Sequence, residues 1–119
     1  MKTRTSSAKA DKNTEHSNQS QIRIRMYRIG FGDCFLLSLP AENGRSAGRC
    51  SHILIDCGVH PQGDIGTMEK VVENITQETN TRLDIIIATH AHKDHISGFG
   101  KLADIFAKFK VGEVWLPWT

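Results

Sequence analysis

The stretch THAHKDHISG, residues 89–98, places three of the chain's six histidines within six positions, with an aspartate among them. Imidazole and carboxylate groups together suit Zn²⁺, and also Mn or Fe. In an extended segment His90 and His92 point the same way, whereas Asp94 and His95, at the turn into a helix, point to a neighbouring position. The spacing therefore predicts a metal centre and favours two ions side by side over one tetrahedral site. The alternative is a solvated histidine-rich loop.

The segments around this cluster predict an α/β fold. The preceding run LDIIIATH, residues 83–90, is β-branched and apolar, which is typical of a strand covered on both faces. A helical apolar period follows over residues 96–109. Further strands are expected at 22–28, 34–39, 52–58 and 111–117, and a helix begins after a cap at Asp64. The order β-β-β-α-β-α-β predicts a layered sheet with helices packed on it.

Two of these elements have a clear inner face. The helix after Asp64 has one apolar face, formed by Ile65, Met68, Val71, Val72 and Ile75. The first strand alternates, so that Ile22, Ile24 and Met26 face one way while Arg23 and Arg25 face the other, which predicts a half-buried strand.

Residues 1–20 are polar and lack periodicity, and we expect a disordered basic tail there. Residues 1–28 carry seven Lys or Arg against two acids, which is +5, and the remaining residues carry eight against eleven, which is −3. Such a tail is usually solvated, but a basic arm can also touch phosphates. A nucleic-acid-binding arm that uses Arg23, Arg25 and Arg28 is therefore one alternative reading.

The cysteine spacing and the distribution of apolar residues indicate the cellular compartment. Cys34, Cys50 and Cys57 show no paired spacing, which predicts three reduced thiols and no disulfide framework. The chain has no run of about 18 apolar residues and no apolar segment typical of a secretory signal. We expect a cytoplasmic protein without membrane association.

Three motifs resemble one known family. The stretch THAHKDHISG is similar to the HxHxDH signature of the metallo-β-lactamase superfamily, and LIDCG, residues 54–58, resembles the strand motif upstream of that signature. The segment YRIGFGDCFLL, residues 27–37, resembles the GxGD opening of the branch that includes the competence protein of DNA uptake. The resemblance implies an αββα sandwich, with residues 21–119 as the N-terminal half of such a domain.

The resemblance also implies roles for individual residues. His90 and His92 would bind a first zinc ion, and Asp94 and His95 a second, with Mn or Fe as alternatives. Asp94 would also be catalytic, because it would orient the attacking water. Asp56 would lie behind a ligand imidazole and fix it, the alternative being an aspartate that caps a turn. Two glycines, Gly58 and Gly98, would let the backbone approach closely.

The implied reaction is metal-assisted hydrolysis. The GFGD opening favours phosphodiester or nucleic-acid substrates, small molecules remain an alternative, and the substrate-binding residues are not assigned. The family's remaining ligands lie downstream of the signature, and no histidine occurs in the 24 residues after His95. We therefore expect weak activity unless a C-terminal half or a homo-oligomer partner completes the site. The alternative function is a non-catalytic fragment or interaction module, with Val114, Trp115 and Leu116 exposed.

Overall fold

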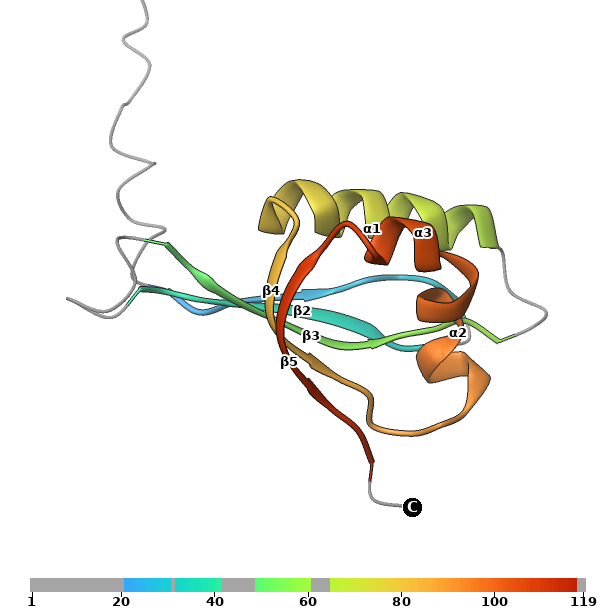
Figure 1. Ribbon diagram of the computed structural model, residues 1–119. Coiled ribbons are helices and arrows are strands. Elements are labelled where there is room, and N and C mark those ends of the chain that lie inside the picture. Colours follow the sequence, from blue (N-terminus) through green and yellow to red (C-terminus); the bar gives the residue numbers. More distant parts are fainter. Residues whose placement is uncertain (1–20, 31, 42–48, 61–64, 118–119) are drawn as a thin grey trace, which may run out of the picture.

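The computed structural model describes residues 21–30, 32–41, 49–60 and 65–117. These residues form a mixed α/β fold, so the predicted class is confirmed (Figure 1). The elements are β1 (Arg23–Met26), β2 (Cys34–Leu39), β3 (Ser51–Cys57), α1 (Ile65–Thr79), β4 (Arg82–Ile87), α2 (Lys93–Lys101), α3 (Ala103–Phe106) and β5 (Lys110–Trp115). The predicted tail over 1–20 and the predicted cap at Asp64 lie outside the described residues.

Strand directions give the sheet two different ends. The described strands form one sheet in the order β1-β2-β3-β4-β5. The β1–β2 and β2–β3 pairs are antiparallel, whereas β3–β4 and β4–β5 are parallel. Consequently β1, β3, β4 and β5 all run the same way, and β2 runs against them. The carboxyl ends of four strands therefore meet at one end of the sheet, and their amino ends meet at the other.

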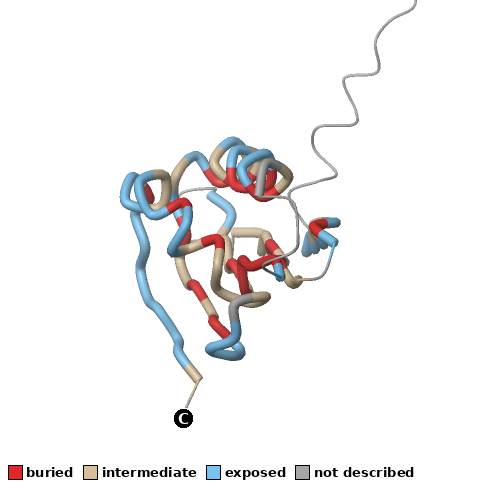
Figure 2. The backbone as a smooth tube through the Cα atoms, turned by 90° about the vertical axis from the view of Figure 1, so that its right-hand side faces the viewer, coloured by how far each residue is buried: buried red, intermediate tan, exposed pale blue. Residues whose placement is uncertain are grey.

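The core lies between the sheet and α1. Met68, Val72 and Ile75 of α1 are completely buried, which confirms the predicted apolar face of this helix. They meet Leu36 and Leu54 from the two neighbouring strands β2 and β3, which are also completely buried. Figure 2 shows the buried residues gathered between the helices and the sheet. Each such side chain contributes about 1.5–3 kcal/mol, so this contact layer dominates the stability of the fold.

The single helix predicted over 96–109 is wrong, because two shorter helices occupy this region. The helix α2 begins already at Lys93, and the backbone leaves helical geometry at Leu102, where φ is −114° and ψ is 32°. The break turns Leu102 and Phe109 into the core, where both are about 8% exposed. Two glycines in α2, Gly98 and Gly100, also lower its helix propensity. None of the described helices has the length and apolar character that crossing a membrane requires.

The face of the sheet opposite α1 is uncovered by any described element (Figure 1). The strand register aligns its side chains in two rows, because paired residues share a face. One row consists of Ile24, Leu37, Ile53 and Ile85 and ends on β5 at the acidic Glu113, and the other consists of Met26, Phe35, Ile55, Ile87 and Trp115. The prediction that β4 is covered on both faces is therefore wrong for the described chain.

The apolar side of β1 also faces the uncovered side. Ile24 is 65% exposed and Met26 76% exposed, so the prediction that this strand buries its apolar side is wrong. The opposite side of β1 faces α1 through polar contacts: Arg25 lies 2.7 Å from the carboxylate of Glu78. These contacts leave the apolar side of β1 turned away from the helix layer. Figure 2 shows β5 exposed along its length, as we expected for Val114, Trp115 and Leu116.

One further polar contact anchors β1 to α1. The hydroxyl of Tyr27 donates a hydrogen bond to Oδ1 of Asn74 at 2.8 Å. Burial disfavours the phenolate and raises the pKa of Tyr27 to about 12. The hydroxyl therefore keeps its proton, and this hydrogen bond, throughout the physiological pH range.

The cysteines are free, as predicted. Cys34 and Cys57 are paired in the β2–β3 register and are both buried. The hydrogen bond between the two thiols, together with burial, raises the pKa of Cys34 far above its ordinary value. Because the thiolate is the reactive form, Cys34 acts as a core residue, and Cys57 is completely buried beside it. Cys50 is exposed.

Candidate metal centre

The candidate site lies at the end of the sheet where the parallel strands finish. Asp56 is near the end of β3, and His90 follows the end of β4. Asp33 immediately precedes β2, which runs the opposite way and therefore starts at this same end. Asp94 and His95 occupy the first turn of α2. Ligands of open α/β sheets bind at the carboxyl ends of the strands, which is the position of this group.

The three signature histidines form one cluster of rings. The ring centroids of His90 and His92 are 5.9 Å apart, and those of His90 and His95 are 4.8 Å apart. The third pair, His92 and His95, is separated by 6.5 Å. His90 and His92 are exposed, whereas the side chain of His95 is 15% exposed. A solvated loop would let the rings point apart, whereas here all three ring centroids lie within 6.5 Å of one another.

Asp56 holds the two sides of this site together. Its carboxylate accepts hydrogen bonds from the backbone N–H of Thr89 at 2.7 Å and from the hydroxyl of the same residue. It also lies 3.0 Å from Nδ1 of His95. The backbone of Asp56 has a φ of 55°, an unfavourable conformation for a residue with a side chain. The partners lie 33 and 39 residues away, so Asp56 links distant elements rather than capping its own turn. Its role behind a metal ligand remains a prediction.

His95 is oriented by carboxylates on both of its nitrogens. Nδ1 faces Asp56 at 3.0 Å and Asp33 at 3.3 Å, and Nε2 lies 3.5 Å from Oδ2 of Asp94. The hydrogen bond with Asp56 is the main cause that raises the pKa of His95 above its ordinary value. With Nδ1 engaged in this way, Nε2 of His95 and the carboxylate of Asp94, 3.5 Å apart, are the neighbouring groups that a shared ion would use.

Asp33 has a larger part in the site than the sequence indicated. From the sequence, Asp33 ends the GFGD turn, and we expect it either at the rim of the site or as a plain turn aspartate. Its backbone N–H donates to the carbonyl of Asp94 at 3.1 Å, and its carbonyl accepts from the N–H of Gly58 at 3.1 Å. Its carboxylate joins Asp56 and His95 in a group whose potential ligand atoms lie within 4.8 Å of one another. The GFGD tetrapeptide, directly before a strand that starts at the site, was the signal that could have found it.

Close backbone packing at Gly58 and Gly98 joins α2 to β3, as predicted. A Cβ on Gly58 would lie 2.5 Å from the backbone of Asp94 and His95. A Cβ on Gly98 would lie 2.6 Å from the carbonyl oxygen of Cys57. Only glycine permits these approaches, which place the first turn of α2 against the end of β3.

The donors gathered here fit a divalent metal. They are imidazole nitrogens and carboxylate oxygens, the ligand types that Zn²⁺, Mn²⁺ and Fe²⁺ accept. Of the four predicted ligands, Asp94 and His95 lie in direct contact, and His90 and His92 flank them through the ring cluster. Their role as metal ligands remains a prediction.

Comparison with known families supports the same chemistry. The family model of the metallo-beta-lactamase superfamily matches residues 48–112, just over half of the chain. The matched segment contains Asp56 and all four predicted metal ligands. Searches of curated proteins and of solved structures found no match.

Proposed function

This chain belongs to the metallo-beta-lactamase superfamily, and on that premise we propose that it is a metal-dependent hydrolase built on His90, His92, Asp94 and His95. The clustering of the three imidazoles within the family-matched segment is the observation that supports this function most strongly. Zinc is the ion we expect, with Mn or Fe as alternatives.

The position of each residue indicates its proposed role in binding the metal or in the reaction. The exposed rings of His90 and His92 offer ligands on one side, and Nε2 of His95 with the carboxylate of Asp94 offers them on the other. When bound, the metal supplies Lewis acidity and lowers the pKa of water. Asp94 accepts a hydrogen bond from the attacking water and so orients it, which makes it the catalytic residue of the proposal. Asp56 fixes the ring of His95 from behind.

The substrate class we propose is a phosphodiester, in a nucleic acid or a small molecule. The support is the GFGD opening, residues 30–33, whose aspartate stands beside His95 at 3.3 Å. The opening is similar to that of a superfamily branch whose members include the competence protein.

Zinc titration of the metal-free chain tests the metal centre. We expect zinc affinity in His92→Ala and in His95→Ala to fall by more than the about ten- to hundred-fold that the loss of an outer hydrogen-bonding partner costs, because each change removes one ligand. Isothermal titration calorimetry measures the affinity and the stoichiometry. His52→Gln is the matched control, because His52 lies in the amino-terminal half of β3, away from the cluster. Equal zinc affinity in wild type and both site variants would contradict the proposed centre.

Hydrolysis assays on the zinc-loaded chain test the substrate class. We expect slow turnover of bis(p-nitrophenyl) phosphate and less turnover of the β-lactam nitrocefin. The rate should fall in Asp94→Asn, which keeps the shape of the side chain but weakens its hold on both metal and water. Faster turnover of the β-lactam would overturn the phosphodiester assignment while leaving the metal centre intact.

We further propose that the uncovered sheet face packs against a second layer, as in an αββα sandwich. The two apolar rows support this, because contiguous apolar side chains that reach solvent invite association. The layer is a further segment of the protein or a second copy of the chain, and it would also supply the remaining metal ligands. The alternative function, a non-catalytic interaction module, would bind its partner through the same uncovered sheet face.

Sedimentation velocity on the isolated chain tests the second layer. We expect the wild type to self-associate, because burying the exposed apolar side chains releases about 25 cal/mol per Å². The double variant Ile24→Glu, Met26→Glu should shift it toward monomer, since both positions are exposed and tolerate charge. Gln77→Glu, on the exposed side of α1, is the control for added charge. A wild-type chain that remains monomeric at all concentrations would contradict a second copy as the covering layer and would favour a further segment of the protein.

A further inference from the structure

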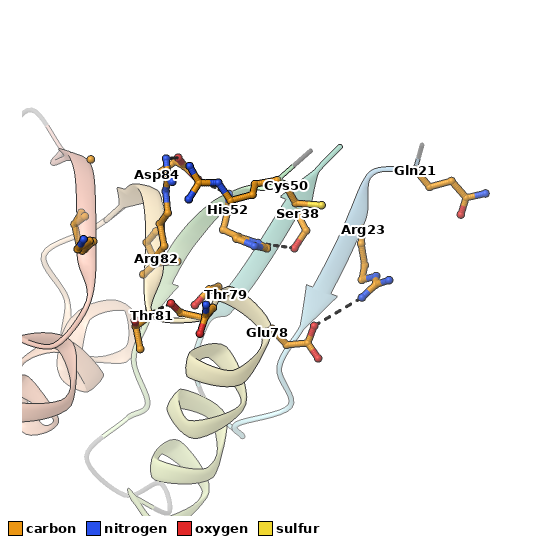
Figure 3. A pocket seen from close by; sticks show the side chains of 16 residues that line it. Gln21, Arg23, Ser38, Cys50, His52, Glu78, Thr79, Thr81, Arg82 and Asp84 are labelled. Carbon is orange, nitrogen blue, oxygen red and sulfur yellow. Dashed lines mark hydrogen bonds and ion pairs between the residues drawn. The ribbon is translucent and has the colours of Figure 1, made fainter. Parts of the chain in front are cut away.

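A second concave region lies at the end of the sheet away from the metal centre. It is a groove of about 810 Å³, lined by the starts of several strands and by the turn between α1 and β4 (Figure 3). The metal centre lies at the carboxyl ends of the parallel strands, and this groove lies at their amino ends. Nothing in the proposed hydrolase chemistry uses it.

Every strand that starts at this end brings a cation to the groove. Arg23, Arg82 and Lys110 are the first residues of β1, β4 and β5, and Arg49 lies two residues before β3. All four line the groove. Figure 3 shows Arg23 and Arg82 on separate strands along its wall. The parallel arrangement of four strands therefore produces a row of positive charge across the width of the sheet.

The acids in the groove are already engaged. Glu78 is held by Arg25 at 2.7 Å and lies 3.7 Å from Arg23. Asp84 accepts the backbone N–H of His52 at 2.8 Å and lies 3.5 Å from Arg82. Because these two carboxylates face four cations, the groove has an excess of two positive charges.

Two of the cations have no acidic partner among the residues that the structure describes. Within the described residues, neither Arg49 nor Lys110 forms an ion pair. The imidazole of His52 adds no charge at neutral pH, because burial lowers its pKa. The uncompensated charge is therefore carried by Arg49 and Lys110.

The strand register places two of these cations side by side. Arg82 and Lys110 are directly paired in the β4–β5 register. Like charges placed opposite each other on neighbouring strands destabilise a sheet, and an anion between them removes that repulsion. The carboxyl end of α1 reaches the groove at Thr79 and disfavours an anion there. The strand side, beside Arg82 and Lys110, is thus the favoured position for a negative group.

We propose that this groove binds a ligand with several phosphate groups, held by Arg23, Arg49, Arg82 and Lys110. Strands in a sheet are about 4.8 Å apart, so the cations extend about 19 Å from β1 to β5. A single phosphate contacts only part of that row, whereas a polyphosphate or a short nucleic-acid strand reaches along it. Arginine donates paired hydrogen bonds to phosphate oxygens, which suits it to this role.

Binding to the whole chain in the presence of EDTA tests the groove without the metal centre. The probes are inorganic tripolyphosphate and a fluorescein-labelled eight-nucleotide single-stranded DNA, followed by calorimetry and by fluorescence anisotropy. We expect each of Arg49→Gln and Lys110→Gln to weaken binding about fivefold and to reduce the salt dependence by about one ion. Neither residue forms an ion pair in the described chain, so both variants should fold normally.

The matched control is Lys108→Gln, which removes the same charge from an exposed site two residues away that does not line the groove. It should change the affinity less than twofold. An equal loss in Lys108→Gln and Lys110→Gln would mean attraction by net charge alone and would overturn the proposal, as would no binding of either probe at millimolar concentration.

The two probes also distinguish the source of the phosphates. Binding of tripolyphosphate that competes with the DNA supports a free polyphosphate ligand, and binding of DNA alone supports a nucleic-acid strand. His92→Ala should bind both probes as wild type does, so a failed metal centre and a failed groove are separable.

Discussion

Replacing Asp56 by alanine should lower the free energy of unfolding by about 3 kcal/mol. The carboxylate is 3% exposed and accepts two hydrogen bonds from Thr89 and one from His95. Its removal leaves the part-buried donors of Thr89 and His95 without their acceptor and detaches the end of β4 from the end of β3. Urea unfolding followed by circular dichroism measures the loss, and zinc affinity should fall about ten- to hundred-fold.

Asp33→Ala is the matched control for this prediction. Its carboxylate faces the same nitrogen of His95 but is 44% exposed, so its loss should cost less than about 1 kcal/mol. Asp56→Asn is a second control. Its amide oxygen can still accept the hydrogen bond from the backbone N–H of Thr89, but its amide nitrogen cannot accept those from the Thr89 hydroxyl and from His95. Unfolding of Asp56→Ala at the wild-type urea concentration would show that this carboxylate is not a structural link.

Replacing Gly58 by alanine should destabilise the protein by about 3 kcal/mol and weaken zinc binding together with it. The new methyl group would lie 2.5 Å from backbone atoms of Asp94, His95 and Ile96, and backbone cannot move aside as a flexible side chain does. The start of α2 must therefore shift away from β3, which carries two predicted ligands out of position. Thermal unfolding and zinc titration on the same samples measure both effects.

A second glycine in the same region provides the comparison. Gly100 lies in α2, and a Cβ there would meet no heavy atom within 4 Å. Gly100→Ala should stabilise the chain by about 0.5–1 kcal/mol, because alanine is the better helix former. If Gly58→Ala were as stable as Gly100→Ala, the close approach of α2 to β3 would not constrain the site.

Much of the fold could be predicted from local patterns. The strand at 34–39 matches its predicted bounds, and the apolar face of α1 points inward as its 3.6-residue period requires. The break at Leu102 could not be predicted, because the apolar period runs unchanged through it and the core, rather than the helix, determines where the chain turns. The alternation in β1 predicts a strand correctly. The local sequence does not determine which side of that strand the helix layer covers.

Some features of the candidate site could likewise be predicted from local sequence, and others depend on the tertiary structure. The residue types and spacing of His90, His92, Asp94 and His95 indicate a metal centre, and their ring cluster agrees with that reading. Asp33 was undervalued, because an aspartate after glycine is common in turns. Only the antiparallel direction of β2 brings it 3.3 Å from His95, which lies 62 positions later.

The sequence by itself determined the positions of the strands and of the first helix, the residue types of the candidate metal centre and the family to which the chain belongs, because these depend on neighbours a few positions apart. The tertiary structure alone decided which side of β1 is exposed, that Asp56 and Asp33 share one histidine, and that four cations meet in a groove at the far end. Each of those outcomes joins residues far apart in the chain, and only the direction and register of the strands bring such residues together.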